Sequence, residues 1–190
     1  LIVRISGLPR LNFFRKIYWK FFSNNVYKVT CPTIATFEKL KLLKIFNLKK
    51  LYILHDPIIS TKEINEKKRE QIEVNFKNKK FILSIGRLTK QKNFSLLLNA
   101  FVDIKKKYPE YNLLILGKGE DQTKIEQIIN SLNLSQSVNL LGYQKNVYKY
   151  LDKAKCFILS SLWEDPGFVL LEASYLNLPI ISSNCPNGPN

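Results

Sequence analysis

Two cations stand close together in the stretch Gly86-Arg87-Leu88-Thr89-Lys90-Gln91-Lys92-Asn93. The stretch follows the pattern of a buried strand, and Gly86 lets the backbone turn where that strand ends. Ligands of an open parallel sheet bind at the carboxyl ends of its strands. At this position the Arg87 guanidinium would hold a diphosphate through two parallel hydrogen bonds, and the Lys92 ammonium would hold it as a single positive charge. A solvated basic loop explains the same residues, because lysine is abundant in this chain.

A second candidate is the stretch Gly117-Lys118-Gly119-Glu120, which also follows the pattern of an apolar strand. Its glycines permit a ligand to approach the backbone closely, but a single Gly-x-Gly is a weak motif. A tight turn accounts for the stretch without any ligand.

The third candidate lies at the start of an apolar helical pattern. Asp165 is a suitable N-cap, and Pro166 suits the first turn of the helix that follows. The amides of Gly167 and Phe168 would then form an anion site at the helix N-terminus.

Two glutamates frame this helix start. Glu164 lies just before the anion site, and Glu172 lies about two turns beyond it, at about 1.5 Å per residue. An elongated ligand with phosphates in its middle would meet a carboxylate at each end. The alternative makes Glu164 a partner of the helix dipole and Glu172 a residue that faces solvent.

Strand and helix patterns alternate from Phe81 onward, and they position these three stretches. Strands are expected at 81–85, 112–116, 138–141, 156–160 and 179–182, and helices at about 94–104, 121–132, 146–154 and 167–177. Buried strands separated by helices pair in parallel, with both faces of the sheet covered. The fold class is therefore α/β with a doubly wound sheet.

Residues 1–59 repeat the alternation less completely. Strands are expected at 1–6, 27–31 and 51–54, and helices at about 10–22 and 33–46. Residues 61–80 are rich in Lys, Glu and Asn, so we expect them to bury little apolar surface. The expected organisation is one α/β domain ending at 1–59, a linker at 60–80 and a second α/β domain at 81–190.

Both ends of the chain interrupt a pattern. Residue 1 is a leucine inside an apolar run, the chain holds no methionine, and it stops within a turn-rich string. We therefore expect the first domain to be largely missing and the second to be truncated. Such a chain would aggregate or be partly molten when expressed alone, and would show no catalytic activity by itself.

Taken together, these stretches resemble glycosyltransferase family 4, whose retaining enzymes have the two-domain GT-B architecture of Rossmann-like domains. The strongest matches are Gly86-Arg87-x-x-x-x-Lys92-Asn93 and the pair Glu164-x7-Glu172. Gly117-Lys118-Gly119-Glu120 and Leu141-Gly142-Tyr143 match less specifically. The resemblance extends over essentially the whole chain.

The resemblance implies a role for each matching residue. Arg87 and Lys92 would hold the donor diphosphate, Glu164 would lie beside the donor sugar, and Glu172 would bind the ribose hydroxyls. The catalytic residues implied are Arg87, Lys92 and Glu164, and the donor-binding residues are Gly86, Gly117, Gly142, Tyr143, Gly167, Phe168, Val169 and Glu172. No Asp-x-Asp motif is present, so we expect neither a metal nor another cofactor.

Three features depart from the family pattern or stand beside it. Glu164-Asp165-Pro166-Gly167 replaces the usual Glu-Gly-Phe-Gly, which predicts a differently shaped loop on the sugar side. Asp56-Pro57 stands where Asn-Pro is usual. His55, the only histidine, lies beside this expected hinge, where a local turn contact explains it better than catalysis.

The formal net charge of +15 invites a nucleic-acid interpretation. Only five of the cations are arginine, however, and no zinc-finger spacing, RNP string or basic zipper is present. We therefore expect no nucleic-acid partner. Cys31, Cys156 and Cys185 are far apart and odd in number, which indicates reduced thiols in a cytoplasmic protein.

Residues 10–22 interleave aromatic and basic side chains, as interfacial helices do. They predict either contact with an anionic membrane surface, peripheral on the inner face of the plasma membrane, or a helix packed inside the first domain.

The function expected from these features is transfer of a hexosyl or N-acetylhexosaminyl group from a nucleotide-sugar donor, a UDP-sugar, to a glycan or lipid-linked acceptor. The tail Asn184-Cys185-Pro186-Asn187-Gly188-Pro189 resembles enzymes that build bacterial surface polysaccharides or lipid-linked glycans. Two alternatives stay open: a non-catalytic nucleotide-sugar-binding module, and a basic nucleic-acid or scaffold protein.

Overall fold

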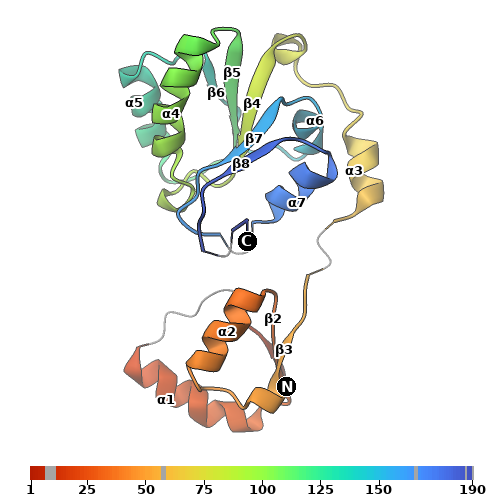
Figure 1. Cartoon of the computed structure of the whole chain (residues 1–190), viewed down its shortest axis with the longest axis vertical. Helices are drawn as coiled ribbons and strands as arrows, with labels where there is room; N and C mark the ends of the chain where they lie inside the picture. Colours follow the sequence, from red (N-terminus) through yellow and green to blue (C-terminus); the bar gives the residue numbers. More distant parts are fainter. Residues whose placement is uncertain (7–11, 57–58, 165–166, 187, 190) are drawn as a thin grey trace. The chain divides into compact units, whose positions relative to one another are not determined.

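The structure, a computed structural model, describes all residues except 7–11, 57–58, 165–166, 187 and 190. The chain divides into two compact units, Leu1–Ile58 and Ile59–Asn190. Their helices and strands are labelled in Figure 1.

The first unit is built on a parallel sheet of three strands in the order β1-β2-β3. Its elements are β1 (Ile2–Arg4), α1 (Phe13–Phe22), β2 (Lys28–Cys31), α2 (Ile34–Leu42) and β3 (Leu51–Ile53). The side chains of Asn12 and Thr33 cap α1 and α2 by accepting backbone N–H groups three residues further on. The core gathers side chains from β2, α2 and the segment that leads to β3, among them Val29, Leu40 and Phe46.

The second unit contains a parallel sheet of five strands in the order β6-β5-β4-β7-β8. The strands are β4 (Lys80–Ile85), β5 (Tyr111–Leu116), β6 (Val138–Leu140), β7 (Cys156–Leu159) and β8 (Ile180–Ser182). The helices are α3 (Thr61–Lys67), α4 (Phe94–Lys107), α5 (Gln122–Ser131), α6 (Tyr148–Leu151) and α7 (Phe168–Tyr175).

Helices cover both faces of this sheet (Figure 1), with α4 and α5 on one side and α3, α6 and α7 on the other. Successive residues of a strand point to opposite faces. Leu113 of β5 accordingly packs with Phe101 of α4, whereas Leu114 packs with Tyr150 of α6 and Ala173 of α7. Both clusters exclude water from the central strands, and this explains their continuous apolar sequences.

The expected strands and helices are present with ends shifted by a few residues, but the expectation for residues 61–80 was wrong. This segment forms α3, and Ile64 is fully buried. Ile72 and Phe76 belong to the core cluster on the α6 and α7 side of the sheet. Residues 60–80 are therefore part of the second unit. Their many charged residues concealed three widely spaced apolar side chains, which are enough to dock a short segment.

All three cysteines are free thiols, as predicted. Within the described residues, no helix is both long and apolar enough to span a bilayer.

Candidate functional site

The order of the five-stranded sheet creates a crevice at the carboxyl ends of β4 and β7. From β4 the chain proceeds outward to β5 and β6, and then crosses to β7 and β8 on the other side of β4. The loops that follow β4 and β7 therefore diverge at a switch point, where ligands of such sheets bind. These loops carry Gly86-Arg87 and Trp163-Glu164, respectively.

Backbone hydrogen bonds join the loops on one side of this crevice. Gly86 N–H donates to Leu116 O at 2.9 Å, and Gly117 N–H donates to Gly142 O at 2.8 Å. Gly117 has a φ of +143°, and a Cβ at this position would lie 1.9 Å from Gly86 O. Gly117 is therefore required for the close approach of two backbones, which is a structural role that needs no ligand.

Lys92 and Glu164 form an ion pair at the centre of the crevice. Their Nζ and Oε1 atoms are 2.6 Å apart, and the two side chains are 14% and 4% exposed. Ser161 donates its hydroxyl to the same carboxylate oxygen at 2.5 Å. The solvent-loop alternative is wrong for Lys92, because its charge is buried against that of Glu164, whereas Arg87 of the same loop is exposed.

Two glycines make room for this pair. A Cβ on Gly86 would lie 2.9 Å from Cε of Lys92, so the lysine side chain lies directly across the glycine. Gly167 has a φ of +66°, and a Cβ on it would lie 3.2 Å from Cγ of Glu164. Small residues on both sides thus fix where the cation and the carboxylate meet.

A hollow of about 420 Å³ opens over the ion pair, and we call it the Lys92 hollow. It is lined by Ile85, Gly86, Arg87, Gln91, Lys92, Trp163, Glu164, Gly167, Phe168 and Val169. Gly167 is the N-cap residue of α7, so the first turn of this helix, whose N–H groups lack intrahelical acceptors, faces the hollow. A guanidinium, an ammonium and a helix N-terminus suit a ligand that carries phosphate.

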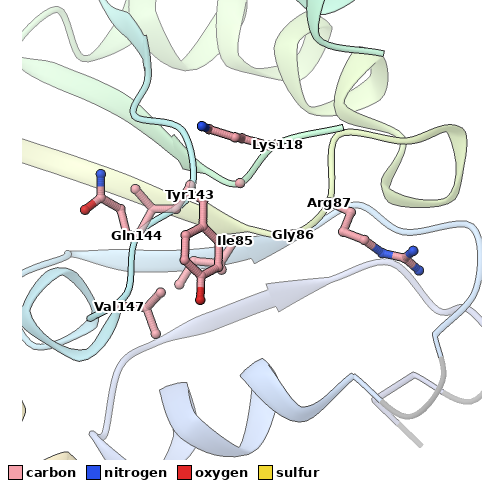
Figure 2. A pocket seen from close by; sticks show the side chains of 9 residues that line it. Ile85, Gly86, Arg87, Lys118, Tyr143, Gln144 and Val147 are labelled. Carbon is pink, nitrogen blue, oxygen red and sulfur yellow. The ribbon is translucent and has the colours of Figure 1, made fainter. Parts of the chain in front are cut away.

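A second hollow, of about 270 Å³, adjoins the first, and we call it the Tyr143 hollow. It is lined by Ile85, Gly86, Arg87, Leu116, Gly117, Lys118, Tyr143, Gln144 and Val147. Figure 2 shows the Tyr143 ring beside Ile85 and Val147, with the Arg87 side chain directed away from it. Arg87 lines both hollows, so an elongated ligand can occupy them together and pass its phosphates beside this side chain.

Glu172 is half-buried on α7 and is not among the residues that line either hollow. Tyr148, which follows Val147 of the Tyr143 hollow, donates its hydroxyl to Glu172 Oε1 at 3.1 Å. Burial raises the pKa of Glu172, the Tyr148 hydrogen bond opposes this rise, and the negative charge of Glu63 adds to it. Burial beside Glu172 also raises the pKa of Tyr148 to about 12, which keeps the phenol a hydrogen-bond donor.

The structure thus brings Arg87, Lys92 and Glu164 into one hollow with Gly86 and the start of α7. The other donor-binding residues predicted from the sequence lie in the adjoining hollow or beside it: Gly117, Tyr143, Gly142 and Glu172. The predicted N-cap Asp165 and first-turn Pro166 lie outside the described residues. The local turn contact expected for His55 is wrong, because its Nδ1 lies 2.8 Å from O of Pro32, a residue 23 positions earlier that follows β2.

Sequence reasoning missed two residues that hold the glutamates. Ser161 lies three residues before Glu164 and was indistinguishable from any serine that follows a strand. Tyr148 lies 24 residues before Glu172 on another helix. A signal for Tyr148 existed, because a carboxylate on an apolar helix requires a partner, and a tyrosine is able to donate a hydrogen bond from inside the core.

A comparison with protein families decides which class of protein this site belongs to. The profile of the family described as "Glycosyl transferases group 1" matches residues 65–190. The chain belongs to the group 1 glycosyl transferases.

Relatives of this group 1 chain are named glycosyltransferases. It is 45% identical over 125 residues to an uncharacterized glycosyltransferase of Methanocaldococcus jannaschii, covering 66% of this chain and 31% of that protein. It is 35% identical over 140 residues to the N-acetylgalactosamine-N,N'-diacetylbacillosaminyl-diphospho-undecaprenol 4-alpha-N-acetylgalactosaminyltransferase of Campylobacter jejuni, covering 74% and 36%. The chain thus spans about a third of the length of these relatives.

Among solved structures, the group 1 chain resembles HepE of Anabaena in complex with UDP and glucose. The TM-score is 0.78 at 14% identity, over 98% of this chain and 53% of that chain. This likeness confirms the predicted α/β fold with Rossmann-like parallel sheets.

Proposed function

We propose that the protein is a retaining glycosyltransferase that uses a UDP-sugar. It moves a hexosyl or N-acetylhexosaminyl group to a hydroxyl of a glycan or lipid-linked acceptor, in the biosynthesis of bacterial surface polysaccharides or glycoconjugates. The observation that carries this proposal is the pair of adjoining hollows that share Arg87 at the switch point of the sheet.

The two hollows suit the two ends of a nucleotide sugar. The Tyr143 hollow is largely apolar and offers aromatic and aliphatic surface to a base. The Lys92 hollow contains the charged residues and accommodates the diphosphate and the sugar. Glu172, beside the Tyr143 hollow, is then within reach of the ribose hydroxyls, for which a carboxylate is a suitable acceptor.

The reaction breaks the bond between the sugar C1 and the diphosphate oxygen. The acceptor oxygen forms its bond to C1 on the same face, and its proton passes to the departing phosphate. The nucleoside diphosphate leaves with the electron pair of the broken bond. Arg87 and Lys92 stabilise the negative charge that develops on it, so the transfer needs no metal in this proposal.

The ion pair with Glu164 prepares Lys92 for this role. The ammonium is held at 2.6 Å from the carboxylate and the Lys92 side chain is 14% exposed, so the ammonium has little freedom to lose when a phosphate arrives. Fixed charges of this kind are more effective than mobile ones, because they need not reorganise during the reaction. Glu164 itself lines the hollow, which supports the proposal that it contacts the sugar.

The name of the Campylobacter relative supports a lipid-linked acceptor, since it specifies a diphospho-undecaprenol glycan. An acceptor of this kind would place the protein at the cytoplasmic face of the membrane. The proposed donor site does not depend on which acceptor the protein uses.

The donor site is tested by measuring UDP and UDP-sugar binding to the wild type, Arg87→Ala and Lys106→Ala. Lys106 is exposed near the C-terminal end of α4, and its replacement by alanine removes one positive charge, as Arg87→Ala does. We expect Arg87→Ala to weaken UDP binding by about 10- to 100-fold, because a charge-assisted hydrogen bond contributes about 1.5–3 kcal/mol, and to lower transfer by roughly 100-fold. Lys106→Ala should change neither quantity.

Equal UDP affinities for the two variants would refute the assignment of Arg87. Selective binding of UDP-sugars by the full-length protein, without transfer to any acceptor, would instead identify a non-catalytic binding module.

A further inference from the structure

Tyr148 of α6 and Glu172 of α7 form a hydrogen bond beside the Tyr143 hollow. The Tyr148 hydroxyl donates to Glu172 Oε1 at 3.1 Å, and both residues are half-buried. Val147, the residue before Tyr148, lines the hollow. The hydrogen bond therefore lies at the edge of the space in which the nucleoside of the donor is proposed to bind.

Tyr148 is itself held in place by contacts on its backbone and on its ring. Its N–H donates to Asn146 Oδ1 at 3.0 Å, and Asn146 Nδ2 donates at 2.9 Å to O of Lys67, the last residue of α3. Its ring packs against the core cluster that contains Phe157 and Ala173. A phenol whose backbone and ring are both fixed is able to hold a carboxylate in one orientation.

The two carboxylate oxygens of Glu172 have different surroundings. Oε1 accepts the Tyr148 hydroxyl. No donor among the described residues reaches Oε2, and every fully buried side-chain oxygen among them has a hydrogen-bond partner, so Oε2 is not fully buried. An ionised carboxylate only accepts hydrogen bonds, and hydroxyl groups such as those of a ribose are able to donate them.

We propose that Tyr148 is a positioning residue for ribose recognition, which holds Oε1 of Glu172 so that Oε2 is oriented toward the ribose hydroxyls of the donor. The inference rests on the donor site proposed above and extends that site to a residue that acts through Glu172. Without the phenol, the Glu172 side chain has more rotamers available, and part of the binding free energy is lost in ordering it. If Tyr148 served only to satisfy a half-buried carboxylate, its loss would lower stability without changing ribose recognition.

The test is calorimetric titration of the full-length protein with UDP and with 2′,3′-dideoxy-UDP, which lacks both ribose hydroxyls. The wild type should prefer UDP by about 10- to 100-fold, because hydrogen bonds to a charged acceptor have this strength. Tyr148→Phe should weaken UDP binding by about 3- to 10-fold, the cost of ordering one flexible side chain. The same variant should bind 2′,3′-dideoxy-UDP as the wild type does, so its preference for UDP should fall by that factor.

Tyr150→Phe is the matched control, because Tyr150 lies on the same helix and donates its hydroxyl to Glu73 Oε1 at 2.5 Å. Glu73 lines neither hollow. Both variants should melt a few degrees below the wild type, since each loses one hydrogen bond between a hydroxyl and a carboxylate. Tyr150→Phe should nevertheless keep the full preference for UDP. Adding Tyr148→Phe to Glu172→Gln should not reduce the preference further, because Tyr148 acts through Glu172.

An undiminished preference of Tyr148→Phe for UDP would overturn the inference and leave the donor site intact. An equal fall of the preference in Tyr150→Phe would overturn it as well, because the effect would then come from loosening α6. If the wild type bound both nucleotides equally, the ribose role of Glu172 would fail together with that of Tyr148, whereas the phosphate contact of Arg87 would stand. Absence of UDP binding to the wild type would refute the donor site itself, and this inference with it.

Discussion

The buried pair Lys92–Glu164 predicts a specific relation between stability and activity. Removing one partner of a buried ion pair leaves an uncompensated charge, which destabilises a protein by about 3–5 kcal/mol. Lys92→Met leaves the Glu164 carboxylate, which is only 4% exposed, so we expect a loss of about 3 kcal/mol. Glu164→Gln leaves the charge of Lys92, whose side chain is 14% exposed and therefore better hydrated, so we expect a smaller loss of about 2 kcal/mol.

The double variant Lys92→Met/Glu164→Gln leaves no buried charge at this position. Its stability should lie within about 2 kcal/mol of the wild type, whereas independent effects would add to about 5 kcal/mol. The difference is a coupling of about 3 kcal/mol. Urea unfolding at neutral pH measures the three free energies, and the melting temperature of Lys92→Met should fall by roughly 6–12 °C.

Transfer activity should not follow stability in this cycle. The double variant regains stability but still lacks the cation that faces the diphosphate, so its transfer should remain about 100-fold below that of the wild type. The reasoning is refuted if the stability losses of the two single variants simply add. It is also refuted if the double variant regains both stability and transfer, since Lys92 would then serve the fold alone.

Two further variants test the surroundings of this pair. Burial raises the pKa of Glu172, so the contribution of this residue to stability is present below the ordinary pKa of 4.5 and is lost as the pH rises. The melting temperature of Glu172→Gln should therefore be higher than that of the wild type at neutral pH, but not at acid pH. The same variant should bind UDP more weakly. Equal melting temperatures across this range, or unchanged UDP affinity, would contradict that role. Gly117→Ala should destabilise the protein by at least about 2 kcal/mol, because its Cβ would lie 1.9 Å from Gly86 O and its φ of +143° is strained for alanine. If urea unfolding gave this variant the stability of the wild type, the two loops would be able to move apart at no cost in stability.

The sequence was most informative where local pattern and tertiary environment agree. The run 81–85, which is apolar except for Ser84, predicted β4 within one residue, because a strand covered on both faces is apolar along almost its whole length. The apolar spacing of residues 94–104 predicted α4, because one side of that helix lies on the sheet and must be apolar. The prediction for residues 61–80 was wrong because their average composition is that of a linker, although the side chains of Ile64 and Phe76 are buried in the core.

The site was predicted as a set of residues, but not as a set of contacts. Lys92 and Glu164 are 72 residues apart, and only the adjacency of β4 and β7 brings them together. Motif spacing carries no information about such a distance. For the same reason the sequence did not reveal that Tyr148 would hydrogen bond to Glu172, or that Gly117 would press against Gly86.

The ion pair also bears on how the protein distinguishes its ligand from the small anions that surround it in the cell. The chain as a whole carries a net charge of +15, yet within the Lys92 hollow the charge of Glu164 cancels that of Lys92, and Arg87 alone is left in excess. Free phosphate or sulfate therefore meets a smaller net positive charge in this hollow than the composition of the whole chain suggests. A ligand that remains bound gains further affinity from the Tyr143 hollow, whose apolar surface at Ile85, Tyr143 and Val147 suits a nucleoside better than an inorganic ion.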